Sequence, residues 1–172
     1  MRHAIITGGA GFIGSHLVDR LLAEGDWRVT VIDKFDPFYP RAVKEANMAA
    51  HLNHPDYRFI EGDILDDAVL DSAFNEKGAV VVHIAAKAGV RPSIADPIGY
   101  HRVNVTGTPK LLERARYSEV AHFVLASSSS VYGVDPNVPW KEKERGIQPI
   151  SPYAATKLSA EGFAQVYAHL HG

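Results

Sequence analysis

Short apolar runs alternate along the chain with longer segments in which apolar residues recur every three or four positions. The short runs predict buried strands at His3–Thr7, Arg28–Asp33, Tyr57–Glu61, Val80–His83 and His122–Ser127. The periodic segments predict helices at Phe12–Glu24, Arg41–His51, Asp67–Phe74, Ile98–Tyr117 and Pro152–His171. Strands separated by helices are typical of an α/β protein with a parallel sheet and right-handed crossovers.

Two stretches interrupt this alternation. Pro109 falls inside the helix predicted over Ile98–Tyr117. An interior proline removes a helix hydrogen bond and costs about 3 kcal/mol, so we expect a kink near Thr106–Pro109. The stretch from Tyr132 to Pro149 combines prolines with mixed charges, which predicts a long loop of functional or mobile character.

Composition narrows the class of protein. The chain has 172 residues, and we take 1–172 as one domain with a sizeable core. Its net charge of −2 gives no indication of a nucleic-acid partner, and no apolar run predicts a membrane span or a signal peptide. The absence of cysteine excludes disulfides, thiolate metal sites and cysteine nucleophiles. We expect a cytoplasmic protein without a metal.

A glycine-rich run follows the first predicted strand and opens the first predicted helix. It reads Thr7-Gly8-Gly9-Ala10-Gly11-Phe12-Ile13-Gly14. Glycines there permit positive φ and let the backbone approach a pyrophosphate, while the helix N-terminus presents free amides to the anion. Strand, glycine turn and helix in this order predict a dinucleotide site. The cofactor contacts that we expect in the turn are Gly8, Gly11, Phe12, Ile13 and Gly14.

This turn has two other interpretations. A triphosphate-binding loop requires a lysine after the last glycine, and Ser15-His16 stands there instead. A glycine-rich turn without any ligand stays an alternative. The dinucleotide interpretation predicts a three-layer Rossmann fold whose parallel sheet has the strand order 3-2-1-4-5.

The ends of the next two strands carry carboxylates. Asp33 is placed to accept hydrogen bonds from the adenosine ribose and to repel a 2′-phosphate, which predicts NAD rather than NADP. Its neighbour Lys34 softens that preference. The pair Asp63-Ile64 either brackets the adenine or caps the following helix.

A second group of residues points to acid–base chemistry. Tyr153 and Lys157 are four residues apart in a predicted helix, so they share one face, and an ammonium near a phenol favours the phenolate. Tyr-x-x-x-Lys alone is a weak signal. It gains weight from the serine run 127–130 at the carboxyl end of the fifth strand, where ligands of α/β sheets bind. A serine-rich turn is the alternative for that run.

Four motifs together resemble the extended short-chain dehydrogenase/reductases, in the NAD-dependent epimerase/dehydratase family. The motifs are Thr7–Gly14, His83-Ile84-Ala85-Ala86, Ser127–Gly133 and Tyr153-Ala154-Ala155-Thr156-Lys157. Within that family the chain is most similar to the UDP-sugar 4-epimerases. Ala88-Gly89-Val90-Arg91 and the serine run resemble the UDP-glucuronate 4-epimerase branch.

The resemblance implies a role for each residue of these motifs. Tyr153 takes the proton of the sugar 4-hydroxyl while hydride passes from C4 to NAD, and Lys157 binds the nicotinamide ribose; both also contact the cofactor. Ser128 lies between the sugar oxygen and the tyrosine. Ala85 and Ala86 pack against the cofactor. The substrate contacts are Arg91, Ser128, Ser129 and Ser130.

The resemblance also carries alternatives. A dehydratase would have Asp-Glu where Ser129-Ser130 stands, which argues against dehydration. A catalytically silent NAD-binding module and a reductase or dehydratase relative stay open. Members of the family are about twice as long as this chain, so we expect the C-terminal substrate-binding part to be absent.

The resemblance further predicts a UDP-sugar ligand and a homodimer through the helices at 98–117 and 152–171. In a chain of this length the fifth strand becomes a sheet edge. We therefore expect the isolated chain to bind NAD with negligible epimerase activity, and either to associate through that edge or to have low solubility.

Overall fold

The computed structural model describes residues 1–136, 138–143 and 148–172. The chain forms two compact units. The sheet unit comprises Met1–Ala85 and Lys110–Ala126, and the helical unit comprises Ala86–Pro109 and Ser127–Gly172. Within the described ranges no helix combines the length and the apolar character needed to cross a membrane.

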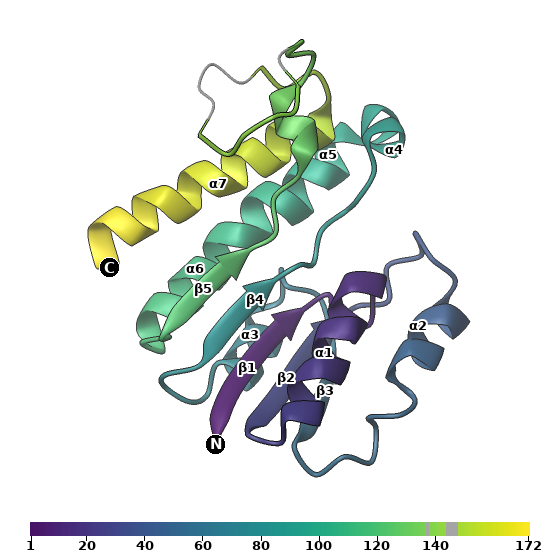
Figure 1. Cartoon of the computed structure of the whole chain (residues 1–172), viewed down its shortest axis with the longest axis vertical. Coiled ribbons are helices and arrows are strands. Elements are labelled where there is room, and N and C mark those ends of the chain that lie inside the picture. The colour runs from purple at the N-terminus through teal and green to yellow at the C-terminus, as the bar shows by residue number, and fades with distance from the viewer. Residues whose placement is uncertain (137, 144–147) are drawn as a thin grey trace. The chain divides into compact units, whose positions relative to one another are not determined.

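The sheet unit is built on five parallel strands (Figure 1). They are β1 (Arg2–Thr7), β2 (Trp27–Asp33), β3 (Tyr57–Glu61), β4 (Val80–His83) and β5 (His122–Leu125). Their order is β3-β2-β1-β4-β5, with Thr7 of β1 opposite Ile32 of β2 and His83 of β4. The parallel sheet and the predicted strand order are confirmed.

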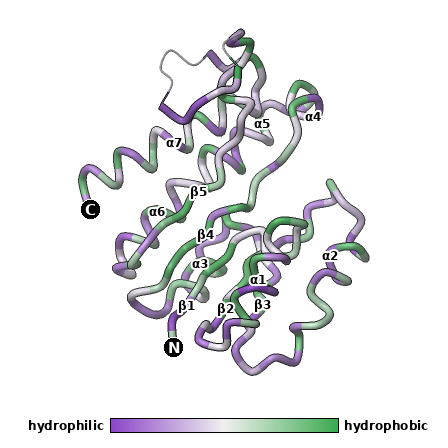
Figure 2. The backbone as a smooth tube through the Cα atoms, in the orientation of Figure 1, coloured by the Kyte–Doolittle hydropathy of each residue, from purple (hydrophilic) through white to green (hydrophobic). Residues whose placement is uncertain are grey.

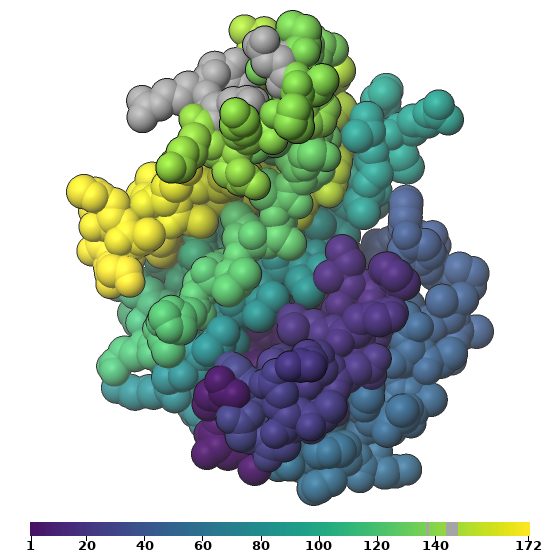
Figure 3. All heavy atoms as spheres, in the orientation of Figure 1, coloured from purple at the N-terminus to yellow at the C-terminus, as the bar shows by residue number. Residues whose placement is uncertain are grey.

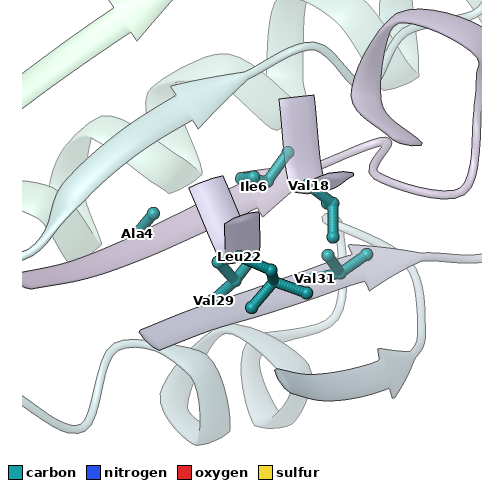
Figure 4. Close-up of a cluster of buried hydrophobic side chains, with 6 residues drawn as sticks. All are labelled: Ala4, Ile6, Val18, Leu22, Val29 and Val31. Atoms are coloured by element: carbon teal, nitrogen blue, oxygen red, sulfur yellow. The ribbon is translucent and has the colours of Figure 1, made fainter. Parts of the chain in front are cut away.

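One face of this sheet is covered by α1 (Phe12–Glu24). Figure 2 shows hydrophobic and hydrophilic residues alternating along this helix, as its amphipathic sequence requires. Its apolar side meets β1 and β2 in a buried cluster (Figure 4) of Ala4, Ile6, Val18, Leu22, Val29 and Val31. In the ribbon of Figure 1 α1 lies in front of the sheet, and the space-filling view in Figure 3 shows the atoms of this N-terminal region on the same face. The helix ends at Gly25, which takes a φ of 75°.

The remaining helices of the sheet unit complete its layers. α2 (Arg41–Met48) contacts α1, whereas α3 (Asp67–Ala73) lies behind the sheet in the view of Figure 1. The part of α6 (Gly107–Tyr117) that belongs to this unit is bound to α3 by ion pairs. Asp67 lies 2.9 Å from Lys110 and 3.1 Å from Arg114. Helices on both faces of a parallel sheet make the three-layer Rossmann fold.

The helical unit is organised around the long helix α7 (Pro152–His171). Four short segments contact it: α4 (Val90–Ala95), α5 (Pro97–Tyr100), the π-helical turn η1 (His101–Thr106) and the 3-10 turn η2 (Ser129–Tyr132). The sequence analysis predicted neither α4 nor η2, because segments of four to six residues carry too little periodicity to be recognised.

The helix predicted over Ile98–Tyr117 is present, and its middle is π-helical: α5, η1 and α6 follow one another directly, with helical backbone at Tyr100, His101 and Gly107. Pro109 is the third residue of α6, so the departure from α-helical hydrogen bonding lies just before the residue that lacks an N–H. The hydroxyl of the preceding residue, Thr108, donates to the carbonyl of Asn104, one turn earlier in the helix, at 2.8 Å.

β5 forms one edge of the sheet in this chain, as predicted. It ends at Leu125, two residues before the predicted Ser127, and its Val124 side chain is 51% exposed. The loop predicted over Tyr132–Pro149 consists of turns and irregular backbone after η2 in its described part, while residues 137 and 144–147 lie outside the described residues.

A buried histidine lies at the start of the sheet. His3 is 9% exposed, and its Nε2 lies 2.9 Å from the hydroxyl of Thr30. Its Nδ1 is buried without a hydrogen-bond partner in the described part of the chain. Burial, followed by the charge of Arg28, lowers the pKa of His3 below its ordinary value of 6.5.

We expect the free energy of unfolding to fall below pH 6.5 more steeply in the wild type than in His3→Gln. The unfolded histidine takes up a proton there while the folded one resists it, so stability is lost as pH decreases, by at most about 1.4 kcal/mol per pH unit. Urea unfolding of both proteins at several pH values measures the difference. Parallel pH profiles of the two proteins would contradict it.

Candidate functional site

The turn after β1 requires glycine at two positions. Gly8 has a φ of 77°, and a Cβ there would lie 2.8 Å from the backbone nitrogen of Ala85. A Cβ on Gly14 would lie 2.3 Å from the carbonyl oxygen of Gly8. Both distances are too short for any side chain, so these glycines serve the close backbone approach that a pyrophosphate cradle needs.

The same turn leaves the first amides of α1 available. Gly11 is the N-cap and has no side chain to accept from them. Phe12 and Ile13 follow with their side chains 72% and 66% exposed, and no acidic residue occupies the first turn. Free amides and a positive helix end without a competing carboxylate are suited to bind a diphosphate.

The end of β4 is held against this turn. The Thr7 hydroxyl oxygen accepts the amide of Ala85 at 3.2 Å and lies 2.7 Å from Nδ1 of the buried His83. Ala85 therefore lies beside Gly8, and its contact with the cofactor stays a prediction. His83 acts here as a packed strand-end residue.

Asp33 is buried at the end of β2, with its carboxylate held from three sides. One oxygen accepts the amide of Ala10 at 3.2 Å, and the other accepts the amide of Phe35 at 2.8 Å. The ammonium of Lys44, on α2, lies 3.3 Å from the oxygen that accepts the amide of Phe35.

The charge of Asp33 also affects Tyr57 on the neighbouring strand β3. Burial of the Tyr57 phenol, together with the nearby Asp33 charge, raises the pKa of Tyr57 to about 12.

Lys34 adjoins Asp33 in the chain, but its ammonium lies 3.1 Å from Asp63. Its effect on the cofactor preference stays a prediction. Lys44 was missed. It shares the buried side of α2 with Met48, four residues later, and a lysine on the apolar side of a short helix is the signal that could have found it.

Asp63-Ile64 follows β3 as predicted, and the structure decides between its two interpretations in part. Asp66 caps α3 by accepting the amide of Ala68 at 2.9 Å, so Asp63 is not the helix cap. One Asp63 oxygen accepts the amide of Leu65 at 3.0 Å, and Ile64 is buried. A contact with adenine stays a prediction.

The start of α7 carries the predicted catalytic pair of the helical unit. Ser151 is the N-cap and Pro152 the first helical residue, as expected. Tyr153 is half-buried in the first turn, and Lys157 is 6% exposed one turn later. Burial lowers the pKa of Lys157 to about 8, so the ammonium still predominates at neutral pH.

The serine run forms a tight turn next to α7. Ser128 caps η2: its hydroxyl oxygen accepts the amide of Ser130 at 3.2 Å, and the hydroxyl oxygens of the two serines lie 2.8 Å apart. Ser129 is exposed, while Ser127 donates to the carboxylate of Glu161 on α7. The backbone of the serine run is thus a serine-rich turn, and the contact of these serines with a substrate stays a prediction. The turn η2 contacts α7, the helix that carries Tyr153.

Three further residues of interest lie in the helical unit. Tyr132, the last residue of η2, stacks on Trp140 with ring centroids 5.4 Å apart. The predicted substrate contact Arg91 is exposed on α4, and the predicted cofactor contact Ala86 is the first residue of this unit.

No group of histidine, aspartate and glutamate side chains in the described ranges is placed to hold a metal ion.

Comparison with known proteins gives consistent matches. The family described as GDP-mannose 4,6 dehydratase matches residues 5–172. A probable UDP-glucuronate 4-epimerase of Rhizobium meliloti is 39% identical over 97% of this chain and 49% of its own length. The chain therefore spans about half the length of the curated relatives that it matches.

Two solved structures are similar to this fold. The UDP-glucuronic acid 4-epimerase of Bacillus cereus, in complex with UDP-glucuronic acid and NAD, has a TM-score of 0.89 at 34% identity. It is matched over 98% of this chain and 53% of its own. DesIV, a dTDP-glucose 4,6-dehydratase of Streptomyces venezuelae with NAD bound, has a TM-score of 0.88 at 36% identity, over 99% of this chain and 52% of its own.

The buried Lys157 has a measurable signature. In the folded chain its pKa lies near 8, against 10.5 ordinarily, so between these pH values the unfolded lysine holds a proton that the folded one has lost. The free energy of unfolding of the wild type, relative to Lys157→Met, should therefore rise by about 3 kcal/mol from pH 8 to pH 10.5. Denaturant unfolding across that range tests this. A constant difference would show that the lysine is not desolvated.

Proposed function

Because the chain belongs to the GDP-mannose 4,6-dehydratase family of NAD-dependent epimerases and dehydratases, we propose that it is the NAD-binding, catalytic-residue-bearing portion of a UDP-sugar 4-epimerase. The observation that carries the cofactor assignment is the glycine turn. A Cβ on Gly8 or Gly14 would fill the place where the backbone approaches, and the buried carboxylate of Asp33 ends the neighbouring strand. This is the residue set that a dinucleotide needs.

The reaction that we propose is oxidation and re-reduction at C4 of the sugar. When bound, NAD supplies a reversible hydride acceptor. Tyr153 removes the proton of the 4-hydroxyl and later returns it, so the phenol alternates between acid and base. The Lys157 ammonium supports the phenolate by its charge, and the Ser128 hydroxyl bridges the sugar oxygen and the phenol.

Ser129 and Ser130 favour epimerisation over dehydration. Dehydration of the sugar needs an acid and a base beyond the tyrosine, and serine hydroxyls supply neither at neutral pH. The similarity to DesIV keeps a dehydratase relative as the second candidate. Accumulation of a 4-keto product would identify that alternative.

We propose UDP-glucuronate as the substrate, since similar proteins include epimerases of that sugar nucleotide. Arg91 would meet negative charge of the ligand, and Ser129 and Ser130 would meet the uronate carboxylate.

The proposal also includes a cytoplasmic location and a homodimer that pairs α5–α6 and α7. On α7, Phe163 and Val166 are apolar residues that are 39% and 51% exposed, which supports a partner on that helix. On the other helix Val103, Leu111 and Leu112 are buried, so these three residues do not support the dimer.

The cofactor preference tests the adenosine end of the site. We expect calorimetry to give tighter binding of NAD than of NADP, and Asp33→Asn to narrow the ratio by at least about tenfold, because the charge that repels a 2′-phosphate is gone. Lys44→Met should widen the ratio, since the ammonium 3.3 Å from Asp33 is removed. Lys34→Met removes a lysine that pairs with Asp63, and it should change the ratio less than Lys44→Met does. Tighter binding of NADP by the wild type would reject the assignment.

The catalytic assignment depends on the phenol. Tyr153→Phe should lower the kcat of UDP-glucuronate epimerisation by at least about 10²-fold in a chain extended by the C-terminal half of a relative, and it should lower any residual turnover of this chain as well. NAD affinity should survive, since the phenol is not needed to hold the cofactor. Chromatographic separation of the two epimers measures kcat. A kcat near that of the wild type would remove Tyr153 from the mechanism.

A further inference from the structure

The first turn of α7 has a complete set of hydrogen-bond partners, and one of them comes from another element. A helix leaves its first amides without intrahelical acceptors. Pro152 has no N–H, and the amide of Ala154 donates to the N-cap Ser151 at 3.1 Å. The amide between them, that of Tyr153, donates to the hydroxyl oxygen of Ser93 on α4 at 3.1 Å. The catalytic tyrosine thus receives its cap from outside its own helix.

Ser93 is oriented for this role. Its side chain is fully buried, and its hydroxyl donates to the carbonyl of Val90 at 2.6 Å. Because the hydroxyl proton is engaged there, a lone pair is left to face Tyr153. A buried hydroxyl with both functions satisfied holds its geometry, since the loss of either partner leaves a buried polar group unpaired.

The segment 88–100, which comprises α4 and α5 and the residues before them, also holds the ring of Tyr153. Tyr100 is 2% exposed and meets that ring edge to face, with centroids 6.3 Å apart. The Tyr100 hydroxyl donates to the carbonyl of Ala88, which fixes it within the same segment. Backbone and ring of the catalytic tyrosine are therefore both held by segment 88–100.

The entry to this segment is bound to α7 as well. The side chain of Asn104, in the π-helical turn, accepts the amide of Lys87 at 2.8 Å and donates to the Thr156 hydroxyl at 3.0 Å. Thr156 in turn donates to the carbonyl of Tyr153 at 2.7 Å. The segment that carries Arg91 is thus connected with α7 at its start and at Ser93.

We propose that Ser93 is a positioning residue, whose buried hydroxyl fixes the backbone of Tyr153 to the segment that carries Arg91. Engagement of a nucleotide sugar by Arg91 and the placement of the Tyr153 phenol then depend on one rigid segment. The roles of Arg91 and Tyr153 rest on the proposed function, whereas the connection between Ser93 and Tyr153 does not.

The test compares two serines that cap adjacent amides of one helix. Ser93→Ala removes the acceptor of Tyr153, and Ser151→Ala removes that of Ala154, so both variants lose one cap of α7. We expect amide exchange by NMR to accelerate at least about tenfold at Tyr153 in the first variant and at Ala154 in the second. The ring signals of Tyr153, assigned through Tyr153→Phe, should move in Ser93→Ala alone. Ser93→Thr keeps the hydroxyl and should restore them.

Turnover of UDP-glucuronate, measured in the chain extended by the C-terminal half of a relative, adds a second readout. Ser93→Ala should lower kcat by between about tenfold and about 10²-fold with KM within about twofold, the pattern of a displaced catalytic group, whereas Ser151→Ala should keep both constants near those of the wild type. Equal effects of the two variants on the ring signals, or unchanged exchange at Tyr153 in Ser93→Ala, would overturn the proposal. A wild type that does not bind NAD, or an extended chain that turns over no sugar, would refute the proposed function, and the NMR comparison would still decide the role of Ser93.

Discussion

Close approach of backbone to backbone at the end of β1 is the constraint on which the sheet unit depends. Gly8 meets the end of β4 and Gly14 meets Gly8, with room for no side chain at either position. This contact fixes where α1 begins, and hence which of its residues reach the cluster on β1 and β2. It also presents the amide of Ala10 to Asp33, so the end of β2 is fixed by the same turn.

The two buried lysines Lys44 and Lys157 lie in different electrostatic environments. Lys44 lies beside a carboxylate that already accepts two amides, and its charge is balanced where it is buried. For Lys157 the loss of hydration dominates, and its pKa falls to about 8. Burial of a lysine ammonium destabilises its charged form. In the proposed function, the negative charge of the Tyr153 phenolate would offset that cost.

The features that local sequence determines were predictable. Strand order followed from five apolar runs and the glycine turn, and Tyr153 and Lys157 share a helix because their spacing is a helical one. Lys44 and Ser93 could not be found in this way, because their partners lie on other elements and only the tertiary fold brings them together. The irregularity expected near Pro109 takes the form of the π-helical turn His101–Thr106, which the sequence pattern does not distinguish from an α-helix.

The stack of Tyr132 and Trp140 has an optical consequence. The sequence contains two tryptophans, and they are divided between the two units. Trp27 begins β2, under the guanidinium of Arg2, whereas the Trp140 indole donates to the carbonyl of Asp135 next to the serine turn. Each unit therefore carries one intrinsic fluorophore in its own surroundings. Emission recorded with one indole replaced would follow the loosening of the sheet unit and of the helical unit separately, without any added label.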